Sequence, residues 1–124
     1  MSIQAYQKAA QKSESPRQTE YRAFAVATRG LIEASKLPTE EIGRRAEAVA
    51  KNRQLWTLLA SDCAAEGNQL SPQLRARIIS LSMFVDRHSR QVVRGADSFD
   101  LLIDLNRTMM EGLSAAQGAT APIP

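Results

Sequence analysis

Residues 70–89 of the chain read LSPQLRARIISLSMFVDRHS, a helix start followed by an uninterrupted amphipathic pattern. Ser71 can accept a hydrogen bond from a free amide of the first turn, and Pro72 has the backbone angle that the first helical position needs. The apolar residues beyond them recur at helical spacing: Leu74, Ile78, Leu81, Val85 and Val92. The stretch therefore predicts an amphipathic helix that begins at Pro72 and ends at Gly95.

Start signals of the same kind predict three further main helices. One begins at Ser15 and Pro16, another at Thr39, and the last at Asp97 or Ser98. No stretch of the chain has the alternating pattern of a strand. The predicted fold is all-α, a compact bundle of four main helices with short connections.

A single domain accounts for most of the chain. We expect residues 1–114 to form this domain, with a short N-terminal helix over residues 2–12. Residues 115–124 have neither periodicity nor enough large apolar groups to pack, which predicts a disordered C-terminal tail.

Composition indicates a cytoplasmic protein that does not enter a membrane. The chain has 44% hydrophobic and 23% charged residues, and its one cysteine, Cys63, cannot form an internal disulfide. No stretch is long and apolar enough to cross a bilayer, and the first residues lack the apolar centre of a signal peptide.

Positive charge is concentrated before residue 95. Residues 1–94 hold fifteen Lys or Arg against nine Asp or Glu, and the later residues hold one arginine against four acids. Arg87 and Arg90 suit the negative end of one helix, next to Asp97 and Asp100 at the start of the next. The alternative is an arginine face that binds a partner, and nucleic acid is a weakly supported candidate because the arginines are scattered and not interleaved with aromatics.

The sequence offers little catalytic chemistry. Cys63 falls on an apolar helix face and His88 lies near the edge of another, so the two residues fit structural roles better than a nucleophilic pair. No metal-ligand spacing and no glycine-rich phosphate loop is present. We expect a non-enzyme with no catalytic, cofactor-binding or metal-binding residues, no cofactor and no small-molecule substrate; an enzyme using Cys63 and His88 is the remaining alternative.

The segment around the single tryptophan is the best candidate for an interaction surface. Trp56 shares a face with Leu59 and Cys63, which predicts a core position. Leu55 and Leu58 widen that face, so it either packs on a third helix or lines a groove for a helical guest. Arg53, one turn earlier, is placed to cover the indole or to pair with an acidic residue of the last helix.

The order of several short motifs resembles the FlaF family of flagellar biosynthesis regulators. The blocks that carry the resemblance are residues 4–6 (QAY), 15–17 (SPR), 20–24 (EYRAF), 27–31 (ATRGL), 52–56 (NRQLW), 59–63 (LASDC), 66–68 (EGN), 70–89, 102–107 (LIDLNR) and 110–113 (MEGL). Each block alone is merely helical, but together they cover nearly the whole chain from residue 2 to about 114.

The resemblance implies a cytoplasmic, non-catalytic factor that promotes flagellin production and export. Proteins of this family are thought to bind flagellin as a secretion chaperone and to act with, and opposite to, FlbT, a regulator of flagellin messenger RNA. Flagellin is thus the expected partner and FlbT a second one. The candidate protein-binding residues are Arg53, Leu55, Trp56, Leu58, Arg87 and Arg90. The alternative function is an RNA-binding regulator of flagellin messenger RNA that uses the arginines.

Overall fold

The computed structural model describes the backbone of residues 16–118 and the side chains of residues 18–114. It contains four helices: α2 (Pro16–Ser35), α3 (Ile42–Ala64), α4 (Pro72–Val93) and α5 (Asp100–Gly118). No strand occurs in this part of the chain, so the predicted all-α fold with four main helices is confirmed. The predicted short helix over residues 2–12 lies outside the described residues.

The ends of α4 form as the sequence predicted. Ser71 Oγ accepts a hydrogen bond from the Leu74 amide at 3.2 Å, and Pro72 occupies the first turn. Beyond the other end, Gly95 has a φ of +77°. A side chain would strain the backbone in this left-handed region, so glycine suits the turn into the last helix. At the start of α5, Ser98 Oγ accepts a hydrogen bond from the Asp100 amide at 3.3 Å.

The start of α3 differs from the prediction. The helix begins at Ile42, and Glu41 precedes it without a capping hydrogen bond from its side chain. The Glu41 amide donates to the Pro38 carbonyl at 3.0 Å, so a turn occupies the position where Thr39 was expected to start the helix. Arg45 stabilises this end of the bundle, because its guanidinium lies 4.9 Å from the centre of the Phe99 ring.

The end of α5 also differs from the prediction. The helix continues to Gly118, whereas the sequence assigned residues 115–124 to a disordered tail. Residues 115–118 are AAQG, in which alanine and glutamine are good helix formers and no breaker occurs before the glycine. The tail prediction is therefore wrong for residues 115–118, and residues 119–124 lie outside the described part of the chain.

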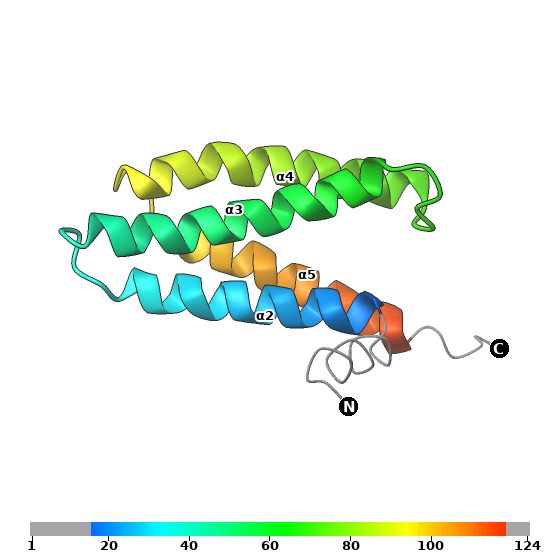
Figure 1. The fold of residues 1–124 in the computed structure, drawn as a ribbon, viewed down its shortest axis with the longest axis horizontal. Helices are drawn as coiled ribbons and strands as arrows, with labels where there is room; N and C mark the ends of the chain where they lie inside the picture. Colours follow the sequence, from blue (N-terminus) through cyan, green and yellow to red (C-terminus); the bar gives the residue numbers. More distant parts are fainter. Residues whose placement is uncertain (1–15, 119–124) are drawn as a thin grey trace, which may run out of the picture.

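The four helices pack as an antiparallel bundle (Figure 1). α3 lies between α2 and α4, and α5 packs against α2 and makes a smaller contact with α4. The register of α3 against α4 is fixed by two polar contacts, from Ser82 Oγ to the Trp56 carbonyl at 3.2 Å and from Arg53 to Asp86. The buried apolar side chains come from all four helices and from Phe99: Phe24, Leu31, Ala34, Val49, Trp56, Leu59, Cys63, Ile78, Val85, Val92, Phe99, Leu102, Ile103 and Leu113.

Only part of the predicted apolar stripe of α4 is core. Ile78, Val85 and Val92 are buried, whereas Leu81 is half-buried and Leu74 is exposed. The register of α4 against α3 places Leu74 level with Ala64, where α3 ends, so no helix remains beside it. The pattern predicted the buried face correctly but not the point at which the partner helix stops.

A short chain of polar side chains crosses the middle of the core. Trp56 Nε1 donates to Asn106 Oδ1 at 2.9 Å, and Asn106 Nδ2 donates to Asn52 Oδ1 at 2.8 Å. All three side chains are buried, and the Phe24 ring meets the Trp56 indole edge to face at 5.4 Å. The two hydrogen bonds join α3 to α5, and the ring contact joins α2 to α3 at the same level. Buried polar groups need hydrogen-bond partners, so these bonds favour one arrangement of the helices.

Candidate functional site

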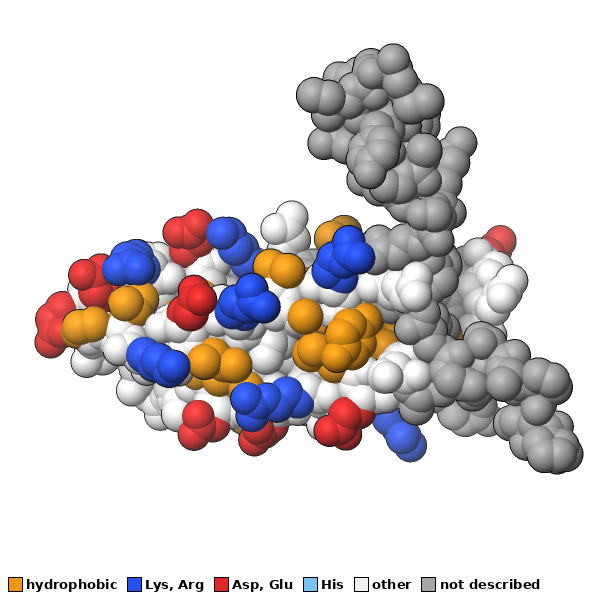
Figure 2. Space-filling view, turned by 90° about the horizontal axis from the view of Figure 1, so that it is seen from below, with side chains coloured by type: hydrophobic (Ala, Val, Ile, Leu, Met, Phe, Trp, Pro, Cys, Tyr) orange, Lys and Arg blue, Asp and Glu red, His pale blue; other side chains and the backbone are white. Residues whose placement is uncertain are grey.

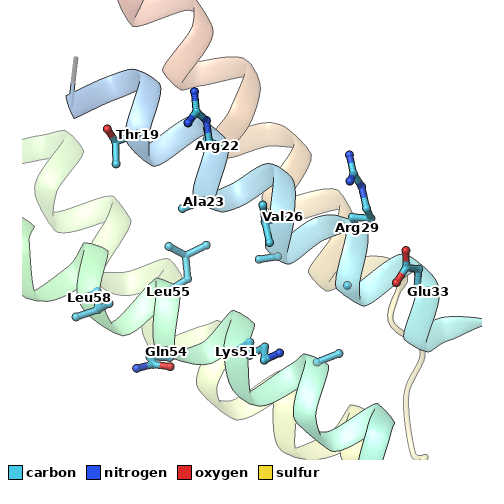
Figure 3. Close-up of a pocket in the computed structure, with 13 residues that line it drawn as sticks. Thr19, Arg22, Ala23, Val26, Arg29, Glu33, Lys51, Gln54, Leu55 and Leu58 are labelled. Atoms are coloured by element: carbon cyan, nitrogen blue, oxygen red, sulfur yellow. The ribbon is translucent and has the colours of Figure 1, made fainter. Parts of the chain in front are cut away.

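An open groove runs between α2 and α3 on the surface of the bundle. Its volume is about 690 Å³. Figure 3 shows Val26 of α2 and Leu55 of α3 pointing into the space between the two helices, whereas Arg22 and Arg29 point away from it. The residues that line the groove are Thr19, Arg22, Ala23, Val26, Ala27, Arg29, Gly30, Glu33, Ala48, Lys51, Gln54, Leu55 and Leu58.

Small side chains hollow out the groove. Ala23, Ala27 and Gly30 follow one another at four- and three-residue steps on α2, and Ala48 lies across from them on α3. A Cβ built on Gly30 would meet no atom within 4 Å, so the space beside this glycine is open. These small side chains form the floor of the groove, and the larger apolar side chains form its walls.

Two apolar side chains of the groove are unusually exposed for their size. Val26 on α2 is 65% exposed and Leu58 on α3 is 62% exposed. Single exposed apolar residues are common on protein surfaces, but here they flank one hollow, together with half-buried Leu55. This arrangement is typical of a surface that receives an apolar partner.

Smaller hollows extend the groove at both ends. A space of about 230 Å³ adjoins Leu55 and Leu58 and reaches Glu20 and Asp62. At the other end, a space of about 210 Å³ reaches Leu37 and Arg44. The groove therefore follows most of the length of the α2 and α3 pair.

Charged side chains surround the apolar lining. Lys51 forms an ion pair with Glu47 on its own helix at 3.2 Å, while Arg22, Arg29 and Glu33 line the α2 side. Figure 2 looks onto α2 from below and shows apolar side chains on this face with Lys, Arg, Asp and Glu around them. An apolar strip between charged margins suits an amphipathic partner better than a wholly apolar one.

The structure separates the sequence-predicted site residues into three groups. Leu55 and Leu58 line the groove. Trp56 is 1% exposed and lies in the core, as its spacing predicted, so its side chain does not reach the surface. Arg53, Arg87 and Arg90 lie away from the groove lining, and two of these arginines share one carboxylate.

That carboxylate is Asp86 of α4. Arg53 Nε donates to Asp86 Oδ1 at 3.1 Å, and Arg90 Nη2 donates to Asp86 Oδ2 at 3.0 Å. The hydrogen bond from Arg53 holds the pKa of Asp86 below its ordinary value, and the positive charges of Arg53, Arg90 and Arg87 act in the same direction against partial desolvation.

These contacts decide between the expectations for the arginines. Arg53 pairs with Asp86 of α4, and the prediction that it covers the indole or pairs with an acid of the last helix is wrong. Its actual partner lies one helix earlier because α3 and α4 are adjacent. Arg90 pairs with Asp86 on its own helix and not with Asp97. The side chain that approaches Asp97 is His88, whose Nδ1 lies 3.7 Å from Asp97 Oδ2. Arg87 is exposed.

The α2 side of the groove was missed by sequence reasoning. The large apolar residues Phe24 and Leu31 of α2 are buried in the core, whereas Val26, Ala23 and Gly30 line the groove. The available signal was the isolated Val26, which lies off the face that Phe24 and Leu31 share. Small residues give no such signal, because alanine and glycine occur on both buried and exposed faces of helices.

Cys63 and His88 do not form a pair. Cys63 is buried near the end of α3, and the Phe84 ring stacks on the His88 ring at 5.5 Å in the later part of α4. The register of the two helices separates these residues by roughly 20 Å along the helix axis. Among the described side chains, no three His, Cys, Asp or Glu residues cluster as metal ligands. None of the helices in the described range is both long and apolar enough to span a membrane.

Comparison with known proteins agrees with the motif order. A family model described as "Flagellar protein FlaF" matches residues 2–113. Neither the comparison with curated proteins nor the comparison with solved structures gave a match. The family match includes all of α2, α3 and α4 and most of α5, the helices that form the core and the groove. The chain therefore belongs to the FlaF family of flagellar proteins.

Proposed function

We propose that this FlaF family member is a cytoplasmic, non-catalytic regulator that promotes flagellin production and export by binding flagellin as a secretion chaperone, opposite to FlbT. The groove between α2 and α3 is the proposed binding site. The observation that carries the proposal is the open apolar hollow flanked by exposed Val26 and Leu58, on a chain of a flagellar family.

The dimensions of the groove suit a helix. Its lining on α2 extends from Thr19 to Glu33, which corresponds to about 21 Å at the rise of an α-helix. A guest helix of about four turns can lie along this length and place apolar residues at i, i+3, i+4 and i+7 against the walls. The polar face of such a guest remains next to Arg29, Lys51 and Glu33 at the margins. We infer that the guest is an amphipathic end segment of flagellin.

A charge placed at the wall of the groove tests the proposal. Leu58→Glu should weaken flagellin binding at least tenfold, because the variant loses the burial of an apolar side chain worth about 1.5 to 3 kcal/mol and must desolvate a carboxylate. Isothermal titration of purified flagellin into the full chain measures the change in Kd.

Met83→Glu is the matched control. Met83 is 58% exposed on α4, similar to Leu58, and does not line the groove. This variant should bind flagellin as the unchanged chain does, and circular dichroism should show both variants folded. Equal binding by the Leu58 and Met83 variants would remove the groove from the proposal, and absence of any flagellin binding by the unchanged chain would remove the chaperone role itself.

RNA binding is the competing function, and Arg87→Glu compared with Leu58→Glu separates it from flagellin binding. Arg87 and Arg94 are exposed on α4, but Arg90 is already paired with Asp86. An RNA site on these arginines would give an affinity that falls steeply with salt, because phosphate contacts release counterions. Salt-dependent binding of flagellin messenger RNA that Arg87→Glu abolishes and Leu58→Glu leaves intact would favour this function over the chaperone.

A further inference from the structure

We propose that two copies of this chain associate through a basic stripe near the end of α4 in one copy and an acidic stripe around the start of α5 in the other. The basic stripe consists of Arg87, Arg90 and Arg94, and the acidic stripe consists of Asp97, Asp100 and Asp104. Neither stripe lines the α2 and α3 groove, so the proposal does not depend on flagellin binding.

Both stripes are exposed and lie on the outside of the bundle. The three arginines lie within about 60° of one another around the helix axis, on the side of α4 away from buried Val85. Asp100 and Asp104 are one turn apart, on the side of α5 away from buried Leu102. The packing of the four helices therefore uses neither stripe.

The folded chain leaves most of these charges without an opposite partner. Among the described side chains, no acid forms an ion pair with Arg87 or Arg94. In the same part of the chain, no basic side chain forms an ion pair with Asp100 or Asp104. Arg90 contacts a carboxylate through Nη2, which leaves further N–H donors of its guanidinium for a second acceptor.

Stabilisation of the helix ends explains only some of these charges. Arg90 lies in the last turn of α4 and Asp100 in the first turn of α5, where each favours its own helix end. Arg87 and Asp104 lie about one turn deeper, where the effect of the helix dipole has fallen off. The charges of these two residues are therefore the ones that a single chain does not use.

The two stripes have matching spacing. The arginines follow one another at steps of three and four residues, and the acids follow one another at the same steps. When α4 of one copy lies antiparallel to α5 of the other, Arg87 comes level with Asp104 of the second copy. Arg90 and Arg94 then come level with the remaining two acids to within about one residue, or about 1.5 Å. Each arginine thus meets a carboxylate, with which a guanidinium can form paired hydrogen bonds.

Such a contact is weak and sensitive to salt. Ion pairs between exposed side chains contribute little individually and are screened by dissolved ions, so association should need concentrated protein. The groove of each copy lies on α2 and α3, away from the paired α4 and α5. An associated pair therefore presents two open grooves.

Sedimentation equilibrium of the full chain at low salt tests the association. We expect the unchanged chain to associate reversibly, with an affinity that falls steeply toward about 1 M salt, where the screening length is about 3 Å. A chain that stays monomeric at every concentration, or an association that salt does not weaken, would overturn the proposal.

Two variants beyond the helix ends locate the contact. Arg87→Glu and Asp104→Lys should each weaken the association about tenfold or more, because each replaces an attraction by a repulsion. Mixed in equal amounts, the two variants should associate again, since the unchanged acidic stripe of the first meets the unchanged basic stripe of the second. Arg77→Glu is the matched control, because Arg77 is exposed on α4 outside the basic stripe and the charge change is the same.

The other outcomes exclude the proposal. Equal weakening by Arg77→Glu would show that net charge alone governs the association. Two folded variants that stay monomeric after mixing would show that α4 and α5 do not pair between copies, and lowered unfolding midpoints in both would place the attraction of Arg87 and Asp104 within one chain. A monomeric chain that binds an RNA oligonucleotide, and loses it in Arg87→Glu, would assign the basic stripe to nucleic acid.

Discussion

At the scale of single residues, the polar chain through Trp56, Asn106 and Asn52 is the most specific feature of the core. The spacing of Trp56 predicted its burial, but its partner could not be predicted, because the pattern of one helix does not show which residue of another helix lies opposite it. Only the diagonal approach of α3 and α5 brings the indole nitrogen to the Asn106 side chain at 2.9 Å. The sequence therefore predicts that Trp56 is a core residue, whereas only the packing of the helices shows that Asn106 is its hydrogen-bond partner.

Asn106→Ala should destabilise the domain by about 3 kcal/mol. The change removes both hydrogen bonds of Asn106 and leaves Trp56 Nε1 and Asn52 Oδ1 buried without partners, at about 1 to 3 kcal/mol for each group. Urea unfolding followed by tryptophan fluorescence measures the loss.

Asn52→Ala provides the comparison at the other end of this polar chain. It leaves one partner unsatisfied and also removes Asn52 Nδ2, a buried atom with no hydrogen bond among the described residues. Its cost should be clearly smaller than that of Asn106→Ala. Equal costs for the two substitutions would mean that the bond between Trp56 and Asn106 contributes little.

At the scale of the helices, local sequence signals predicted most boundaries. Ser71, Pro72 and Gly95 act as expected, because capping and left-handed turns depend on nearby backbone alone. The start of α3 was displaced because a turn at Pro38 competes with the cap at Thr39. The extent of burial along α4 was not predictable, since it depends on where the neighbouring helix ends.

The stripe of α4 gives a prediction at this scale. Ile78→Ala should destabilise the domain by about 2 to 5 kcal/mol through lost burial and a residual cavity, because Ile78 is buried. Leu74→Ala removes a similar number of atoms from an exposed position and should cost less than about 1 kcal/mol. Thermal or urea unfolding of both variants measures the difference. Similar losses would show that the register of α4 against α3 is wrong.

At the scale of the whole molecule, the candidate site is a property of two helices and not of one. Leu55 and Leu58 were identified because they widen the apolar face of α3. Whether that width fills a gap between helices or stays open depends on the size of the side chains opposite, and these are Ala23, Ala27 and Gly30 of α2. The pairing of α2 with α3 therefore completes a site of which the sequence indicated only half.

The same arrangement explains why the arginines of α4 are a poorer site. Asp86 forms ion pairs with Arg53 and with Arg90 where α3 and α4 meet. The lowered pKa of its carboxyl group favours the ionised form that these pairs need. From the sequence, Arg53 was expected to cover the indole or to pair with an acid of the last helix, and Arg90 to lie next to Asp97 and Asp100. The pairing of Arg53 with Asp86 depends on the contact between α3 and α4, which no local pattern reveals, whereas Arg90 pairs with Asp86 on its own helix.

The central claim is that the α2 and α3 groove receives a helix of flagellin, and methyl NMR of the full chain with unlabelled flagellin tests it most directly. The account predicts that the methyl signals of Val26, Leu55 and Leu58 shift on titration, while that of Leu74, exposed at the start of α4, stays in place. Shifts confined to α4, or no shift at a flagellin concentration that forms the complex, would contradict it.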